Sequence, residues 1–229
     1  MKKILLFGLL SMLSVSSLNA QKKNVIKIRP LTLVIGNYDL TYERAIGSKS
    51  SVALNFSFLN WDVKDEIKPY IKGTVNSASI SGYMVTPQYR YYFKGEAPKG
   101  FYINPFFQYG KYTVAQNNTD QYNFSSGSSA SLSILGLGAG LGYQWVMGAF
   151  TIDWNFFGIG VQSWDLSFKY DVLTADNNTN ANDIVTNLDN SGLFPGFKVA
   201  YPSTGGIEIN GPKAILPMFK SNLSLGFAF

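Results

Sequence analysis

Hydrophobic and polar residues alternate along several stretches of the chain, and the C-terminal segment shows this pattern most clearly. The two alternating sets there are Leu223, Leu225, Phe227 and Phe229, and Asn222, Ser224, Gly226 and Ala228. Because successive side chains of a β-strand point to opposite faces, this period predicts a strand with one hydrophobic face.

Large apolar residues alternate with glycines between positions 135 and 145, where Gly136, Gly138, Gly140 and Gly142 share one face of a predicted strand. Glycine weakens a strand unless that face is crowded. The interior of a barrel of about eight strands is only just wide enough for side chains, so it supplies the crowding. The strict period of two, without a strand-turn-helix context, argues against a phosphate-binding glycine loop.

The same alternation predicts seven strands. They cover residues 38–46, 50–61, 79–93, 100–114, 131–146, 150–164 and 218–229. Single-chain bacterial barrels have an even number of strands, so we expect an eighth. We place it at residues 24–35, with an irregularity at Pro30 and a tight turn at Gly36-Asn37. The alternative is one strand over residues 31–46 and an extra strand in the last long loop.

In the predicted strand over residues 150–164, the residues that face inward and those that face outward change places at Gly158. This change predicts a β-bulge at that position.

The composition favours a barrel that lies in a membrane. The chain has no cysteine, and its 14% charged and 15% aromatic residues would leave a soluble surface short of charge. Beyond the N-terminal segment, no apolar stretch is long enough for a membrane helix, and a closed ring of strands is then the remaining way to cross lipid. The predicted fold is all-β, a transmembrane antiparallel up-and-down β-barrel of eight strands.

Charged and aromatic positions support the membrane interpretation. Charged residues within a few positions of a predicted strand end are Arg44, Arg90, Asp153 and Lys220. We therefore expect strand centres without charge, because a lipid-facing Lys or Arg costs about 2–4 kcal/mol at the midplane. Aromatic residues predicted to face outward beside short turns are Tyr89, Tyr91, Phe93, Phe101, Tyr143 and Trp145. This clustering predicts the aromatic girdle of a membrane interface.

The N-terminal residues have the features of a secretory signal peptide. Lys2 and Lys3 precede an apolar run over residues 4–13, and a stretch of small residues ends at Ala20. We expect a signal peptide over residues 1–20 and one barrel domain over residues 21–229. Long polar segments near residues 62–78, 115–130 and 165–217, the last with a short helix near Asp183, alternate with short links. In such barrels the short turns face the periplasm, so the long segments are expected to be extracellular loops.

Three short segments resemble a known group of proteins. They are Tyr38-Asp39-Leu40-Thr41-Tyr42-Glu43-Arg44-Ala45, Gln88-Tyr89-Arg90-Tyr91-Tyr92-Phe93 and Gly100-Phe101-Tyr102-Ile103. With the last dozen residues, they resemble a family of small outer-membrane barrels of unknown function, common in Bacteroidota and OmpA-like or OmpX-like in architecture. The final strand, with Phe227 and the terminal Phe229, also resembles the signal that the outer-membrane assembly machinery recognises. The resemblance implies the fold and the location but no activity.

The absence of histidine and cysteine from the chain limits its chemistry. Outer-membrane barrel enzymes of the phospholipase, lipid A deacylase, palmitoyltransferase and protease types resemble one another in relying on a histidine base. Imidazole is the most frequent general base near neutral pH, so we expect no enzymatic activity and no catalytic residues. We also expect no cofactor and no metal. The formal net charge is +5, of which Lys2 and Lys3 supply two, and the rest is too scattered for nucleic-acid binding.

Several charged residues fall on the predicted inner face of the barrel. They are Asp39, Glu43 and Arg90, with Arg29 and Lys27 as candidate partners. One interpretation is a plug-like network of salt bridges that closes the lumen and fixes the strand register. The other is a constriction that selects small solutes.

The sequence therefore predicts a non-enzymatic outer-membrane β-barrel with a structural or surface-interaction role. The alternatives are a narrow pore for small solutes and a barrel subunit of a larger secretion or motility assembly. Expected partners are outer-membrane lipid and lipopolysaccharide, the assembly machinery during biogenesis, and an unidentified surface ligand, but no nucleic acid. An eight-stranded interior is normally filled by side chains, which favours the first function over the pore.

Overall fold

The computed structural model describes residues 22–62, 75–119, 125–170, 198–200, 207–211 and 213–229. The expected signal peptide over residues 1–20 and the expected helix near Asp183 lie outside these residues. Within the described ranges, no helix has the length and apolar character needed to cross a membrane.

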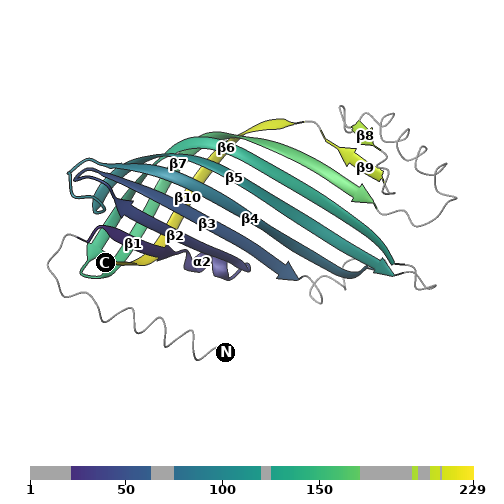
Figure 1. The fold of residues 1–229 in the computed structure, drawn as a ribbon, viewed down its shortest axis with the longest axis horizontal. Coiled ribbons are helices and arrows are strands. Elements are labelled where there is room, and N and C mark those ends of the chain that lie inside the picture. The colour runs from purple at the N-terminus through teal and green to yellow at the C-terminus, as the bar shows by residue number, and fades with distance from the viewer. Residues whose placement is uncertain (1–21, 63–74, 120–124, 171–197, 201–206, 212) are drawn as a thin grey trace, which may run out of the picture.

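Eight antiparallel strands form a closed ring (Figure 1). They are β1 (Asn24–Ile28), β2 (Asn37–Ala45), β3 (Ser50–Asp62), β4 (Val75–Tyr92), β5 (Gly100–Thr119), β6 (Ser125–Met147), β7 (Phe150–Tyr170) and β10 (Ala214–Ala228). Each strand pairs with the next, and β10 closes the ring by pairing with both β7 and β1. The predicted all-β, eight-stranded, up-and-down barrel is confirmed.

The first strand is shorter than expected. The sequence predicts a strand over residues 24–35, but β1 ends at Ile28 and a one-turn helix, α2 (Pro30–Leu33), follows. Pro30 has no N–H to donate to a strand ladder, whereas the first helical position needs none, so it ends β1 and begins α2. Gly36, with φ +69°, then turns the chain into β2. The alternative of one continuous strand over residues 31–46 is therefore wrong.

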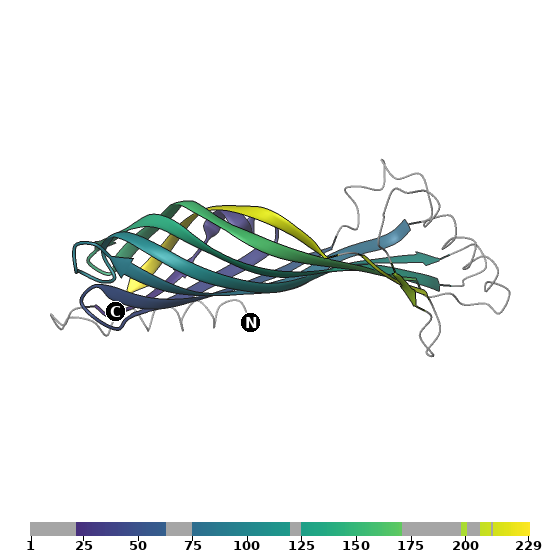
Figure 2. The same ribbon diagram turned by 90° about the horizontal axis from the view of Figure 1, so that it is seen from above.

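The central strands run further than the alternation predicts. Residues 115–119 and 125–130, expected in a loop, belong to β5 and β6, and β7 continues to Tyr170. The ends of β5 and β6 are rich in Ser, Asn and Gln on both faces, so they carry no apolar period to mark them as strand. Two further short strands, β8 (Lys198–Ala200) and β9 (Ile207–Asn210), continue the sheet from β7. Figure 2 shows β4 to β7 extending beyond the ring as a sheet.

The side chains alternate between the two faces of the wall as expected. In β2, Tyr38, Leu40 and Tyr42 are exposed on the outer face, while Asp39 and Glu43 are buried. The hydrophobic side chains are therefore on the outside of this barrel and the polar ones are inside. That arrangement is the reverse of a soluble barrel, whose apolar residues form the core.

A β-bulge in β7 exchanges the two faces. Leu141 pairs with Phe157 and Gly142 pairs with Asn155, so Phe156 is the extra residue. Phe156 and Phe157 are consecutive and both exposed on the outer face. The bulge predicted near Gly158 is confirmed, two residues earlier in the strand.

Aromatic side chains gather at the end of the barrel that carries the short turns. The links between β2 and β3, β4 and β5, and β6 and β7 all lie at this end, as does the C-terminus (Figure 1). Ring pairs there are Tyr91–Phe93, Phe93–Phe101, Phe101–Phe156, Tyr143–Trp145 and Phe227–Phe229. Their centroids lie 4.6–6.3 Å apart, which is the range of favourable aromatic contacts.

Candidate functional site

The barrel interior is narrow because glycines on β6 face large side chains on β5. A Cβ atom on Gly140 would lie 2.7 Å from Asn104 Oδ1, and one on Gly138 would lie 2.8 Å from the ring of Phe106. At Gly142 it would collide with the Tyr102 hydroxyl group. The alternate glycines therefore make room for side chains that cross the lumen, as the sequence pattern predicted.

We call the half of the lumen towards the short turns the lower lumen and the half towards the long strands the upper lumen. Four charged side chains meet at the centre of the lower lumen. Lys27 Nζ lies 2.6 Å from Glu43 Oε2 and 2.6 Å from Asp153 Oδ2. Arg90 Nη1 lies 3.1 Å and 2.7 Å from the same two oxygens. Each of these side chains is at most 4% exposed. We call these four residues the charge cluster; its two cations and two carboxylates balance.

Neutral polar groups add further hydrogen bonds to the charge cluster. Gln144 Oε1 accepts hydrogen bonds from Lys27 and Arg90, at 2.9 and 3.1 Å. Tyr92 and Tyr102 donate their hydroxyl protons to Glu43 and Asp153, at 2.6 and 2.7 Å. With Ser51, which donates to Glu43, the connected residues come from seven of the eight ring strands. β10 supplies Gly226, where a Cβ atom would lie 2.6 Å from Lys27 Cγ. The cluster thus ties together strands that are not neighbours in the sheet.

A small apolar group closes the barrel below the charge cluster. Ala45, Ala97, Tyr92 and Tyr102 pack together and are all buried. Ala97 belongs to the link between β4 and β5, and its N–H donates to the Ser48 carbonyl of the neighbouring link at 2.8 Å. This end of the lumen is filled by side chains and covered by a turn.

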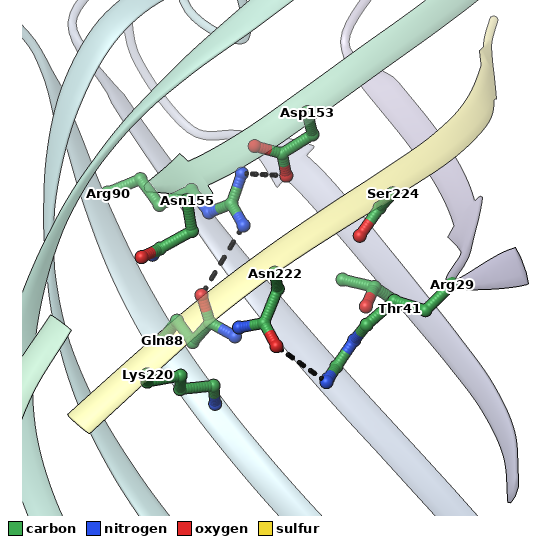
Figure 3. Close-up of a pocket in the computed structure, with 9 residues that line it drawn as sticks. All are labelled: Arg29, Thr41, Gln88, Arg90, Asp153, Asn155, Lys220, Asn222 and Ser224. Atoms are coloured by element: carbon green, nitrogen blue, oxygen red, sulfur yellow. Dashed lines mark hydrogen bonds and ion pairs between the residues drawn. The ribbon is translucent and has the colours of Figure 1, made fainter. Parts of the chain in front are cut away.

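A second polar layer lies above the charge cluster, on the side away from the short turns. Arg29 Nη2 lies 2.9 Å from Asp39 Oδ2 and donates to Asn55 Oδ1 at 2.7 Å, while its Nη1 donates to Asn222 at 3.0 Å. Lys220 projects into the same space from β10, with its Nζ 4.8 Å from the centroid of the Phe106 ring. Figure 3 shows Arg29, Lys220 and Asn222 around one pocket, with Arg90 and Asp153 at its far side.

Two cavities border this upper layer. The pocket of Figure 3 has a volume of about 20 Å³, which is room for one water molecule. The other, about 290 Å³, lies towards the long strands and is the larger of the two. Arg29 and Lys220 line both cavities. The interior is therefore filled by buried side chains at the turn end and holds cavities above it.

A model of the family described as "Protein of unknown function (DUF3575)" matches residues 5–183. The chain belongs to this family. No curated protein matches this DUF3575 member. Among solved structures, it is similar to the crystal structure of a major outer membrane protein from Thermus thermophilus, at 15% sequence identity and a TM-score of 0.39. That match covers 90% of this chain and 98% of the other.

The structure of this DUF3575 chain brings the sequence-predicted lumen residues into two groups. Glu43, Arg90 and Lys27 meet in the charge cluster, whereas Asp39 pairs with Arg29 in the layer above it. The sequence did not separate these groups, because the height of a residue in a barrel depends on strand register as well as on its face.

Sequence reasoning missed Asp153 as a lumen residue and expected the strand centres to be free of charge. Asp153 alternates with Thr151 and Asn155, and all three are buried, so the period of two could have placed it inside. Lys220 was expected near a strand end, but β10 begins at Ala214, which puts Lys220 well inside the strand. Tyr92 and Tyr102 were also missed as lumen residues, although each lies between two outward-facing residues and the period of two could have placed it inside.

The predicted assembly-signal residues lie where the ring closes. Phe229 exchanges two backbone hydrogen bonds with Asn24, at 3.0 and 2.9 Å. Phe227 pairs with Ile26 of β1 and Phe150 of β7. The C-terminal residues therefore hold the first and last strands of the barrel together.

Proposed function

We propose that this DUF3575 protein is an integral outer-membrane β-barrel that does not conduct and is not an enzyme, and that its role is structural or based on surface contacts. The observation that carries the proposal is the inversion of polarity. A closed ring has an apolar outer face, while its ion pairs lie inside. Water would penalise that outer face, whereas lipid requires it.

The apolar band has the dimensions of a membrane. On β6, the outward residues Leu135, Leu137 and Trp145 are exposed, and the stretch between positions 135 and 145 carries no charge. A tilted membrane strand needs about 9–11 residues, which matches this stretch. Arg44 lies on the outer face near the short turns, and Lys111 lies beyond the band towards the opposite end. Charges at these heights cost only ~0–1 kcal/mol.

The orientation follows from the two unlike ends. The short turns and Phe229 would face the periplasm, where the assembly machinery acts, and the extended strands would face outward. Lipid and lipopolysaccharide would surround the band. Among the described residues, β4 before Ser79 and β8 each have a partner strand on one side only, and such an edge can pair with a strand of another protein. These edges support a surface-interaction role, or a place in a larger assembly.

The filled lower lumen argues against the narrow pore. Side chains fill this part of the barrel: the four residues of the charge cluster, Tyr92, Tyr102 and Ala97 of the covering link are all buried. A solute would have to break several charge-assisted hydrogen bonds to pass.

The test is to refold the chain from position 21 onwards in lipid vesicles and planar bilayers. We expect heat-modifiable mobility on a gel, no steady single-channel current from the wild type, and enrichment in outer-membrane fractions of cells. Glu43→Gln is the matched variant. If the charge cluster were a constriction of an open pore, this variant would show a different single-channel current from the wild type. A protein that folds as a soluble β-structured monomer without detergent would disprove the membrane assignment, and stable channels would disprove the sealed lumen.

A further inference from the structure

Lys220 stands apart from the other cations of the lumen. Lys27 and Arg90 share Glu43 and Asp153, and Arg29 pairs with Asp39. In the part of the chain that the structure describes, no carboxylate oxygen lies within 4.0 Å of Lys220 Nζ. Its Nζ lies over the face of the Phe106 ring, 4.8 Å from the centroid.

The described lumen therefore holds one more positive charge than negative charge. Its cations are Lys27, Arg29, Arg90 and Lys220, and its carboxylates are Asp39, Glu43 and Asp153. A cation removed from bulk water without an opposite charge is unfavourable, and the penalty is relieved when an anion comes beside it. The excess charge lies in the upper layer, since the charge cluster is balanced.

The larger cavity lies beside Lys220 and is rich in hydrogen-bond donors. Asn37, Asn55, Gln108, Gln162 and Tyr112 line it together with Arg29 and Lys220. Its one described carboxylate, Asp39, is already engaged by Arg29 and by the Asn55 amide. Asn55 Nδ2 and Gln108 Nε2 already donate to Asp39 and Gln162. Lys220, Asn37, Gln162 and Tyr112 remain as donors for an incoming anion, and little negative charge is present to repel it.

The wall next to this cavity is not a continuous ladder of strands. β10 pairs with β7 from Ala214 onwards, but β1 pairs with β10 only over residues 225–228. Beyond that point α2 lies between β10 and β2, and its Leu31 side chain is 70% exposed. Pro217 and Phe219 of β10 and Asn37 of β2, from the two sides of this interruption, line the cavity. The cavity therefore borders the place where α2 replaces the strand ladder, and this side of the wall is the route by which an anionic group would reach Lys220 from the surrounding lipid layer.

We propose that the upper lumen is an anion-binding site in which Lys220 and Arg29 bind the phosphate or carboxylate group of a small molecule or of a lipid headgroup. Lys220 supplies the uncompensated charge. Arg29, held in place by Asp39, Asn55 and Asn222, supplies a second set of N–H donors. The cavity of about 290 Å³ fits a small organic anion and excludes a polymer.

The experiment uses the refolded full barrel in a non-ionic detergent and a low-chloride buffer, with isothermal titration calorimetry as the readout. Sodium phosphate probes the soluble source, and dodecyl phosphate in mixed micelles probes the lipid source. We expect saturable one-to-one binding of at least one probe. Lys220→Met should weaken binding about tenfold or more, the loss typical of a hydrogen bond to a charged group. Lys220→Arg should retain it.

Lys111→Met is the matched control, because Lys111 is exposed on the outer face of β5 and should leave binding unchanged. Lys220→Met removes an unpaired charge and should still fold, which heat-modifiable mobility checks. Binding of phosphate identifies a soluble anion, and binding of dodecyl phosphate alone identifies a lipid source. No saturable binding of either probe, or equal binding by wild type and Lys220→Met, would overturn the proposal.

Discussion

Replacing Glu43 by glutamine tests whether the charge cluster holds the barrel together. The substitution keeps the size of the side chain but removes one of two carboxylates from a fully buried site. Lys27 and Arg90 lie 2.6 and 3.1 Å from Glu43 Oε2, and in the variant they would have Asp153 as their one shared carboxylate. Removing one partner of a buried ion pair costs about 3–5 kcal/mol, because the remaining charge is left uncompensated.

The free energy of unfolding in lipid vesicles, followed by tryptophan fluorescence in a urea titration, measures this loss. Against a typical total of about 5–15 kcal/mol, a loss of this size would be plain in the unfolding midpoint. Glu96→Gln is the control. The Glu96 side chain is 65% exposed, and its Oε2 lies 3.9 Å from Lys99 Nζ. Glu96→Gln should therefore change the free energy of unfolding by no more than the ~0–1 kcal/mol of a surface ion pair.

A second variant separates charge balance from packing. Adding Lys27→Met to Glu43→Gln restores neutrality, with Arg90 facing Asp153 at 2.7 Å. We expect the double variant to recover a large part of the lost stability. If Glu43→Gln lost no more than Glu96→Gln does, or if the double variant were the sum of its two single losses, the claim that balanced charge stabilises the barrel would be refuted.

Three further predictions concern the packing, the outer face and the closure of the ring. Gly142→Ala would put a methyl group against Tyr102 and 2.8 Å from the Trp154 carbonyl oxygen, so we expect a loss of about 1–3 kcal/mol in the same urea titration. Gly47→Ala, with no atom within 4 Å, should change little, and equal effects would contradict the crowded lumen. Leu137→Lys places a charge on the outer face, where Leu137 is 62% exposed, and should cost about 2–4 kcal/mol in vesicles beyond the cost of Leu137→Ala. A cost of zero would place that face in water. Deleting Phe229 removes both backbone bonds to Asn24 and should lower the folded fraction recovered from outer membranes, measured by heat-modifiable mobility, while Phe229→Tyr retains it. Undiminished folding of the truncated chain would argue against Phe229 as a closing residue.

The alternation of the sequence was sufficient to predict the barrel and the face of most residues. A period of two assigns each side chain to one side of a wall, and in lipid that wall has to close, so the closed ring and the inward positions of Asp39, Glu43 and Arg90 follow from local pattern. The pattern itself marked seven strands, and the eighth was inferred from the even number of strands in such barrels. The same logic placed a bulge within two residues of Phe156. These features depend on neighbouring positions along the chain, which is the information that a sequence displays directly.

Only the tertiary structure decided which charges meet across the lumen. Lys27 and Asp153 are 126 positions apart in the chain, and their contact depends on the register of every strand between them around the ring. Tyr92 and Tyr102 each lie between two outward-facing residues, so alternation places them inside, but register decides that they bond Glu43 and Asp153. Because β1 is short and α2 follows Pro30, the edge of β10 opposite β7 has no partner strand before Leu225 among the described residues, and Lys220 lies there beside a cavity. Alternation sets the face of a residue, but register and closure set its height and its partners, and these are properties of the whole ring.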